Sequence, residues 1–367
     1  MIELEEVAIG GSPIVTLRRH APRDDSRPAF VSAQIAPGRG MMLLSARAVM
    51  GGLGEFDVLA GETPARAREL LDGGPEDFNG NRSFAFGGAI LAPFANRIRG
   101  RLDALTRTVE TRVLGTPVRL TANGGGRAPG AEQYAIHGLI LDAAVGGLRW
   151  SSSADADALE GTLRAGDFGG RWPSRTELAF AWTLRPDALT LAVAATNVGD
   201  APLPVGIGWH PYFALPSGRR GQARLHLPTS ERVLVNDYDE VLPTGVVEQA
   251  AGTAYDFSAP DGRSLCDLYL DDCFVRPRKT AEGHTVCRVV DPAAGYGLQV
   301  VATSPTVSAV QTYAPPDRPF VVLEPQINWA DPYGDVWRGG EDTGMVVLPP
   351  GASTTYEVRL ELFTPAA

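Results

Sequence analysis

The chain is poor in cysteine and histidine and has no excess of positive charge. Its 367 residues include three cysteines and five histidines, and 33 Lys and Arg stand against 43 Asp and Glu, a formal net charge of -10. A nucleic-acid-binding protein gains affinity from basic side chains that neutralise phosphates, and anionic membranes attract basic segments. The charge balance therefore argues against nucleic acid and a membrane surface as partners.

Long apolar runs and targeting features are also lacking. The first residues, MIELEEVAIGG, are acidic where a signal peptide is basic, and no apolar segment follows them. No stretch approaches the ~18 apolar residues of a transmembrane helix. Cys266, Cys273 and Cys287 lack the spacing of a metal site and cannot all pair with one another. We therefore expect a protein of the reducing cytoplasm, without a metal.

Turn residues and alternating segments are abundant. The 42 glycines and 29 prolines are scattered along the chain, which is typical of turns between many strands. Residues 175–184 and 189–195 each alternate with period two and flank a Pro-Asp turn, which predicts a hairpin; residues 356–362 predict another strand. The clearest helix is predicted after Thr63, with Pro64 at its first position and Gly73 beyond its end.

No repeat or linker divides the chain. We therefore expect one large, mostly antiparallel all-β domain over residues 1–367. The glycine-rich segment 123–133, NGGGRAPGAEQ, lacks the Lys-Ser/Thr ending of a phosphate loop, so a flexible surface loop is the better interpretation.

Four stretches carry chemically capable side chains. They are APFANRIRGR with Asn96 and Arg97, AIHGL with His137, VGIGWHPYF with His210, and VVLEPQINWADPY with Glu324. Histidine exchanges protons near neutrality, and a carboxylate that ends an apolar strand is costly unless it is paired or lies in a cleft. Each also fits an ordinary role, as a surface charge, a turn residue, a core histidine or half of an ion pair.

The other three histidines have polar or basic neighbours. We expect His20, His226 and His284 to lie at the surface.

In their order along the chain, these stretches resemble motifs of the aldose 1-epimerase (galactose mutarotase-like) family. NRIRG is similar to its Asn-Arg-Ile motif, AIHGL to its His-Gly motif, and WHPYF to its His-x-Tyr-Phe segment. LDDCF resembles its Asp-x-x-Phe, which selects Asp271 rather than Asp272. VLPTG at 241–245 resembles a recurrent turn of the family, and VQTYAPP carries Gln311 where the family has a glutamine. Trp150 stands where a tryptophan usually follows the His-Gly motif. LEPQINWADPY resembles the segment that holds the catalytic glutamate.

The resemblance implies a β-supersandwich with an open cleft for a monosaccharide or sugar derivative, and interconversion of α and β anomers without a cofactor. Ring opening removes a proton from the anomeric hydroxyl and protonates the ring oxygen, and a carboxylate and an imidazole suit these tasks. By resemblance Glu324 is the base and His210 the acid. Substrate-binding partners would be Arg97, His137, Asp271, Asn96 and Gln311.

Further roles stay open at this point. Trp209 or Trp329 could form a platform for a sugar face or pack in the core. A monomer and a homodimer are both compatible with the sequence.

Three alternatives to this function have distinct requirements. A non-catalytic carbohydrate sensor would keep the cleft without the reaction. A hexose-phosphate mutarotase would need extra basic residues, for which Arg99 and Arg101 are candidates unless they form a solvated turn. A glycoside hydrolase or lyase would use Asp271 and Glu324 as a spaced carboxylate pair.

Overall fold

Antiparallel strands dominate the computed structural model, which describes residues 1–19, 27–74, 77–337 and 339–365. The largest sheet has twelve strands, and β5 (Gly54–Asp57) joins it through β4. The others follow in the spatial order β1 (Ile2–Ile9), β2 (Ser12–Arg18), β3 (Ala29–Ala36), β4 (Met42–Met50), β6 (Gly88–Leu91), β18 (Gly208–Ala214), β27 (Phe320–Gln326), β26 (Ala309–Ala314), β23 (Leu270–Val275), β20 (Glu231–Val235) and β21 (Pro243–Gln249).

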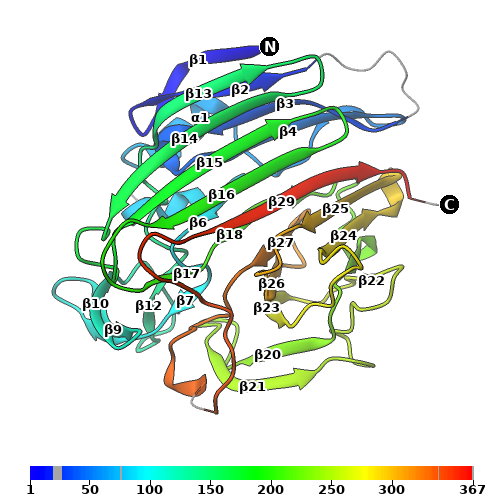
Figure 1. Ribbon diagram of the computed structural model, residues 1–367. Coiled ribbons are helices and arrows are strands. Elements are labelled where there is room, and N and C mark those ends of the chain that lie inside the picture. The colour runs from blue at the N-terminus through cyan, green and yellow to red at the C-terminus, as the bar shows by residue number, and fades with distance from the viewer. Residues whose placement is uncertain (20–26, 75–76, 338, 366–367) are drawn as a thin grey trace.

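A nine-stranded sheet forms the second layer (Figure 1). Its spatial order is β13 (Gly146–Ser152), β14 (Asp157–Gly166), β15 (Thr176–Leu184), β16 (Leu189–Asn197), β29 (Ser353–Phe363), β25 (Tyr296–Ala302), β24 (Thr285–Asp291), β19 (Arg224–His226) and β22 (Arg263–Ser264). The predicted hairpin is β15 and β16, with Leu184 opposite Leu189, and the predicted C-terminal strand is β29. Both predictions are confirmed.

Small sheets and few helices complete the fold. The small sheets are β10 (Thr116–Thr121), β9 (Thr108–Val113) and β8 (Arg101–Asp103); β11 (Gly124–Gly125), β12 (Gln133–Ile136) and β7 (Arg97–Ile98); and β17 (Leu203–Val205) with β28 (Val346–Leu348). Short 3-10 turns lie at Pro37–Arg39, Phe78–Phe84, Arg220–Gln222, Pro292–Ala294 and Asp335–Trp337. The predicted helix is α1 (Pro64–Leu71), and the Thr63 side chain accepts a hydrogen bond from the Arg66 amide as its N-cap.

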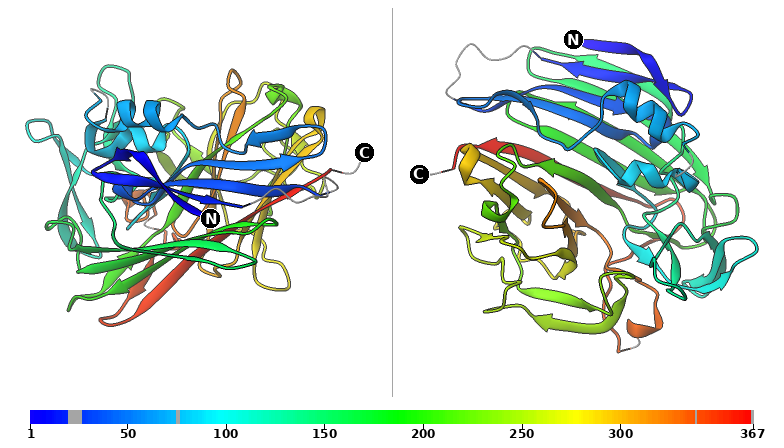
Figure 2. Two further views of the ribbon diagram at one scale, coloured as in Figure 1. Left: turned by 90° about the horizontal axis from the view of Figure 1, so that it is seen from above. Right: turned by 180° about the vertical axis from the view of Figure 1, so that it is seen from behind.

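The two large sheets pack face to face around one apolar core. From above, the blue strands β1–β4 and the green strands with red β29 form separate layers (Figure 2). Trp182 of β15 meets Trp209 of β18 with ring centroids 5.6 Å apart, and the Tyr356 hydroxyl of β29 donates to the Pro325 carbonyl of β27. Trp209 is fully buried in this core. Burial of such large aromatic faces is a main source of stability.

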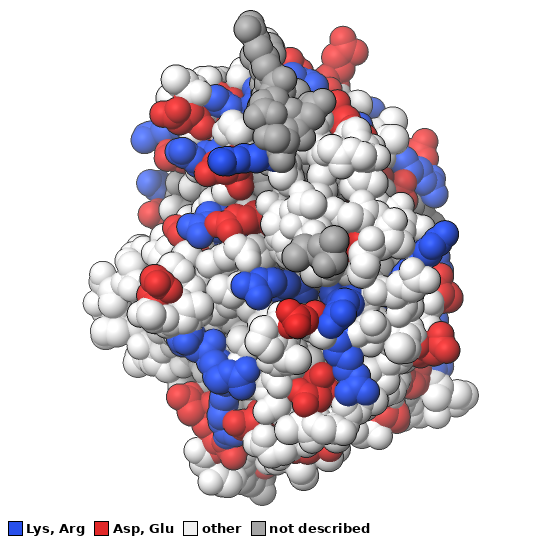
Figure 3. Space-filling model, turned by 90° about the vertical axis from the view of Figure 1, so that its right-hand side faces the viewer, with Lys and Arg blue, Asp and Glu red and all other residues white. Residues whose placement is uncertain are grey.

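Within the described ranges, no helix is long and apolar enough to cross a membrane. The face beside the C-terminal end of β29 carries acidic and basic side chains that are interspersed (Figure 3). No field of a single sign covers this face, in agreement with the mixed charge of the sequence.

Candidate active site

The register of three central strands brings distant residues into one row. Gly208 pairs with Gln326 and Tyr212 with Val322, so His210 of β18 stands opposite Glu324 of β27. Glu324 in turn pairs with Gln311 of β26. Because directly opposed residues of antiparallel strands share a face, these three side chains lie on the same side of the sheet.

That side is the one turned away from the core. Along β18, Trp209 and Phe213 enter the core, and His210 and Tyr212 between them point the other way. Along β27, Val321 and Leu323 belong to the core and alternate with Glu324. The period of two thus separates the residues that pack in the core from the candidate site residues on the opposite face.

The small sheet supplies the second wall of the site. Arg97 of β7 pairs with Ile136 of β12, and the His137 amide donates to the Asn96 carbonyl at 2.9 Å. Gly138 follows His137 with φ +82°, and a Cβ there would lie 2.2 Å from the Ala92 carbonyl oxygen. Only glycine fits this position, and the close approach fixes the direction of His137.

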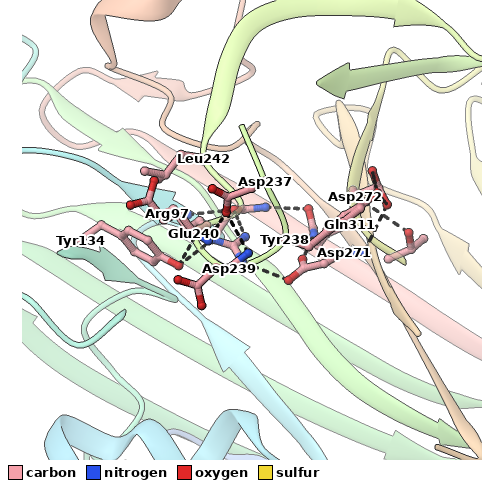
Figure 4. Close-up of polar contacts among 12 residues, drawn as sticks. Arg97, Tyr134, Asp237, Tyr238, Asp239, Glu240, Leu242, Asp271, Asp272 and Gln311 are labelled. Atoms are coloured by element: carbon pink, nitrogen blue, oxygen red, sulfur yellow. Dashed lines mark hydrogen bonds and ion pairs between the residues drawn. The ribbon is translucent and has the colours of Figure 1, made fainter. Parts of the chain in front are cut away.

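Four of the predicted substrate-binding residues form a closed network. Arg97 donates to the Asp271 carboxylate at 3.2 Å and to the Asn96 Oδ1 at 3.0 Å. The Gln311 amide donates to Asp271 at 2.7 Å and accepts a hydrogen bond from Asn96 at 2.8 Å. The Tyr134 hydroxyl accepts a bond from Arg97 Nε and donates to the Glu240 carbonyl (Figure 4).

His210 and Glu324 form a buried pair, with Nε2 and Oε2 3.8 Å apart. Glu324 is fully buried beneath the cleft, and His210 is 6% exposed. Neither Glu324 oxygen, nor Nδ1 of His210, has a hydrogen-bond partner among the described residues. Unsatisfied buried polar atoms are rare and point to a function or a ligand.

Burial changes the pKa of both groups in opposite directions. It raises the pKa of Glu324 well above its usual value, an effect that the Arg97 charge reduces. It lowers the pKa of His210 to about 4. The charged form of either group is costly in this environment, so the pair favours a state that holds one proton.

His137 lies against His210, with ring centroids 4.9 Å apart, and its other side faces the Phe84 ring. Burial lowers the pKa of His137 well below its usual value, and nearby His210 and Arg97 add to this effect. His137 is therefore a neutral imidazole that can share hydrogen bonds with a sugar oxygen.

A cleft of about 900 Å³ opens above the pair and reaches the network. Such a volume suits a small ligand. Its lining includes His210, His137, Arg97, Asp271 and Gln311. Tyr212, Tyr313 and Arg127, which stand in stretches quoted above without a role of their own, also line it. Further lining residues that no motif had marked are Arg82, Phe84, Tyr134, Tyr238, Asp239, Tyr269, Arg318 and Phe320.

The glycine-rich segment is part of this wall. Gly124 and Gly125 pair with Tyr134 and Gln133 as β11, and the loop after them is held by the segment 236–242. The Asp239 carboxylate accepts hydrogen bonds from the backbone amides of Arg127 and Ala128. The Glu240 carboxylate accepts one from the backbone amide of Glu132. Asp239 and Glu240 are labelled in Figure 4. Residues 127–130 are exposed in a surface loop, as predicted, and these hydrogen bonds anchor the loop at the wall of the cleft.

The structure decides between the two roles left open for the tryptophans. Trp209 is a core residue whose indole donates to the Gly88 carbonyl, and Trp329 is buried against Trp337. Neither lines the cleft. Trp150 on β13 is half-exposed.

The candidate basic residues also lie elsewhere. Arg99 binds Glu132 at 2.7 Å, and Arg101 binds Glu110, and neither arginine lines the cleft. Both are therefore ion-paired outside the cleft, Arg99 in the connection between β7 and β8 and Arg101 at the start of β8 rather than in a turn.

The remaining histidines and the cysteines have ordinary surroundings. His226 is half-buried, with Nδ1 2.7 Å from the Ala259 carbonyl, and His284 is also half-buried. His20 lies outside the described residues. Cys266, Cys273 and Cys287 are all free thiols.

Other hollows lack comparable chemistry. A second hollow, of about 700 Å³, lies beside the C-terminal end of β29, and its lining includes Arg224, His226, Arg288 and Glu361. Its described lining residues contain no buried pair comparable to His210 and Glu324. In the part of the chain that the structure describes, no three His, Cys, Asp or Glu side chains are grouped to hold a metal ion.

Solved structures share this architecture. A galactose mutarotase-like protein from Clostridium acetobutylicum matches with TM-score 0.75 and 16% identity, over 100% of this chain and 99% of that one. Galactose 1-epimerase from Lactobacillus acidophilus matches with TM-score 0.65 and 18% identity, over 99% and 98%. At these identities the likeness establishes the fold, the galactose mutarotase-like β-supersandwich.

Sequence comparisons identify the family. An uncharacterized protein of Escherichia coli K12, YphB, is 29% identical over 190 residues, which is 50% of this chain and 58% of that protein. The chain thus matches less than two thirds of this relative's length. The family model described as aldose 1-epimerase matches residues 58–361, and the chain therefore belongs to the aldose 1-epimerase family.

Proposed function

We propose that this protein is a cofactor-independent aldose 1-epimerase that interconverts the α and β anomers of an aldose or a closely related sugar. The observation that carries the proposal is the buried His210–Glu324 pair, 3.8 Å apart, in which neither Glu324 oxygen nor His210 Nδ1 has a hydrogen-bond partner among the described residues. The anomeric hydroxyl and the ring oxygen are both bonded to C1, so the groups that exchange protons with them must also lie close together.

The reaction follows from this spacing. The pair reacts in the form of its one-proton state that has the proton on His210 and Glu324 as a carboxylate, which the neutral pair reaches when the Glu324 proton passes to His210. Glu324 then takes the proton of the anomeric hydroxyl, whose oxygen forms a carbonyl with C1 as the bond from C1 to the ring oxygen breaks. The ring oxygen takes a proton from His210. After rotation about the C1–C2 bond, His210 recovers the proton from the ring-forming hydroxyl, which attacks the other face of C1, and Glu324 returns its proton. The His210–Glu324 pair therefore carries the same number of protons before and after the reaction.

The network around Asp271 holds the sugar in this mechanism. Arg97 and His137 would contact ring or hydroxyl oxygens, and Asp271, Asn96 and Gln311 would bind further hydroxyl groups. These side chains already fix one another through the hydrogen bonds described above, so little ordering remains when a sugar binds. We further propose one domain over residues 1–367, acting in the cytoplasm as a monomer or homodimer.

The test is NMR exchange spectroscopy of anomers over a panel of aldoses, uronates and sugar phosphates. Glu324→Gln and His210→Asn should each lower catalysed exchange by about 10²–10⁴-fold, the typical contribution of general acid–base groups. Glu177→Gln, on β15 of the nine-stranded sheet and outside the cleft, is the matched control and should retain full activity. Unchanged exchange in either site variant, with correct folding by circular dichroism, would refute the mechanism.

Two outcomes would favour other functions. Sugar binding without accelerated exchange across the panel would indicate a carbohydrate sensor. Release of reducing sugar from oligosaccharides would indicate a glycoside hydrolase; against this, the Asp271 carboxylate is engaged by Arg97 and Gln311.

A further inference from the structure

The cleft has an excess of positive charge in an otherwise acidic protein. Among the described residues that line it, four are basic and two acidic, an excess of two, whereas the whole chain carries a formal net charge of -10. The basic residues are Arg82, Arg97, Arg127 and Arg318, and the acidic ones are Asp239 and Asp271. A neutral sugar does not require this concentration of guanidinium groups.

Arg97 is committed to Asp271, but Arg127 has no ion pair with a described residue. Its backbone is held firmly, because its amide lies 2.9 Å from both Asp239 carboxylate oxygens. The Asp239 carboxylate also accepts the Ala128 amide, so its charge is already compensated by two backbone donors. The loop thus presents the Arg127 side chain to the cleft from a fixed base.

Arg318 also lines the cleft, from the turn between β26 and β27. Its partner is the adjacent Asp317, at 3.6 Å, and both side chains are more than half exposed. Such an exposed pair is weak, so the guanidinium group remains available to a ligand.

Tyr313 lines the cleft together with Arg127 and Arg318. Arg127 comes from the glycine-rich segment and Arg318 from the turn after β26, the strand that carries Tyr313. The Tyr313 ring also contacts Phe320. Tyr313 lies two residues from Gln311, which pairs with Glu324, so these side chains share one face of the sheet.

Resting on the proposed function, we infer that the substrate is an anionic sugar, whose phosphate or carboxylate is bound by Arg127 and Arg318 at the mouth of the cleft. The anomeric carbon lies deep, at His210 and Glu324, and the anionic group lies at the exposed end. Guanidinium groups match both anions through paired N–H donors, and the cleft of about 900 Å³ has room for a substituted monosaccharide.

Matched sugars test the inference. Anomer exchange is measured for glucose, glucose 6-phosphate and glucuronate, and for the three corresponding galactose compounds. For at least one series, kcat/KM of an anionic member should exceed that of the neutral sugar by ~10-fold or more, the gain expected from charge-assisted hydrogen bonds. Preference for the phosphate or for the carboxylate identifies which anion the site takes.

Variants assign the effect to the two arginines. Arg127→Gln and Arg318→Gln should each lower kcat/KM for the anionic sugar by ~10-fold and for the neutral sugar by less than ~2-fold. Arg164→Gln on β14, 88% exposed and outside the cleft, is the control and should change neither. Raising ionic strength from about 0.05 to about 0.5 M should weaken the preference, since exposed charges are screened.

The failures are distinguishable. If the neutral sugars are exchanged as well as their anionic derivatives and both arginine variants behave as wild type, this inference is overturned and the proposed function stands. If no sugar is exchanged above the spontaneous rate, the proposed function fails. Titration calorimetry with the same sugars then still tests the anion site, and equal affinity of Arg127→Gln and wild type for every anion would overturn it.

Discussion

The pH dependence of anomer exchange tests the electrostatics of the buried pair. Burial lowers the pKa of His210 from 6.5 to about 4 and raises that of Glu324. At pH 5.5 a histidine with its ordinary pKa is about 90% protonated, whereas one with a pKa of about 4 is only about 3% protonated. The one-proton state of the pair therefore persists into acid, and a second proton enters only near pH 4.

We expect a bell-shaped profile of kcat/KM with its acid limb near pH 4 and its alkaline limb above the usual pKa of a glutamate. Both limbs belong to the pair rather than to one residue. His137 adds no limb near 6.5, because its pKa is also lowered by burial. The measurement is NMR exchange from pH about 3.5 to about 9, with the spontaneous rate subtracted in each buffer. An acid limb near 6.5 would refute the reasoning, since it would mean an imidazole in contact with bulk water.

The same shift has a consequence for stability with a definite sign. In the unfolded chain the histidine at position 210 becomes protonated as pH falls below 6.5. In the folded protein His210 stays neutral until about pH 4. The His210 contribution to the free energy of unfolding therefore falls as pH decreases through this window, whereas the raised pKa of Glu324 acts in the opposite direction. His210→Asn removes the His210 contribution, so in urea titrations the free energy of unfolding of the variant should fall less toward acid than that of the wild type, and an identical slope would contradict the assigned burial effect.

Two further predictions concern the framework of the site. Asp271→Asn removes the Arg97 ion pair and leaves a mostly buried guanidinium group, so the free energy of unfolding should fall by about 3 kcal/mol in chemical denaturation; an unchanged midpoint would contradict the role of the network. Gly138→Ala places a Cβ 2.2 Å from the Ala92 carbonyl oxygen. Gly147 also has a positive φ, but a Cβ there would have no atom closer than 4.0 Å, so Gly147→Ala is the control. Gly138→Ala should therefore lower the thermal midpoint much further than Gly147→Ala. Equal midpoints would show that the close approach costs nothing.

Much of the fold could be predicted because the information was local. Alternation in β15 and β16 and the Pro-Asp turn between them determine that hairpin, since a strand with one buried face has period two. The N-cap and proline of α1 are similarly local. The pairing of His210 with Glu324 follows from register, which the sequence alone does not display, and there the family motifs supplied the missing long-range information.

Other features depend on contacts between distant segments. Trp209 and Trp329 could not be assigned from their neighbours, because the partners that bury them are Trp182 on another sheet and Trp337 in a separate turn. Arg127 stands in a glycine-rich segment that has the composition of a free loop. Its position at the cleft depends on Asp239, 112 residues away.

The proposed reaction and the proposed anion specificity thus depend on different parts of the fold. The proposed proton-transfer pair belongs to central strands, where a slip of one residue in register would turn both groups into the core, so the sheet strongly constrains them. Arg127 and Arg318 belong to connecting segments, which tolerate changes of sequence and length without disturbing that register. Replacing these two arginines should therefore change which sugar is used while the limbs of the pH profile stay where the buried pair sets them. The deep chemistry and the choice of substrate can then be altered separately in this protein.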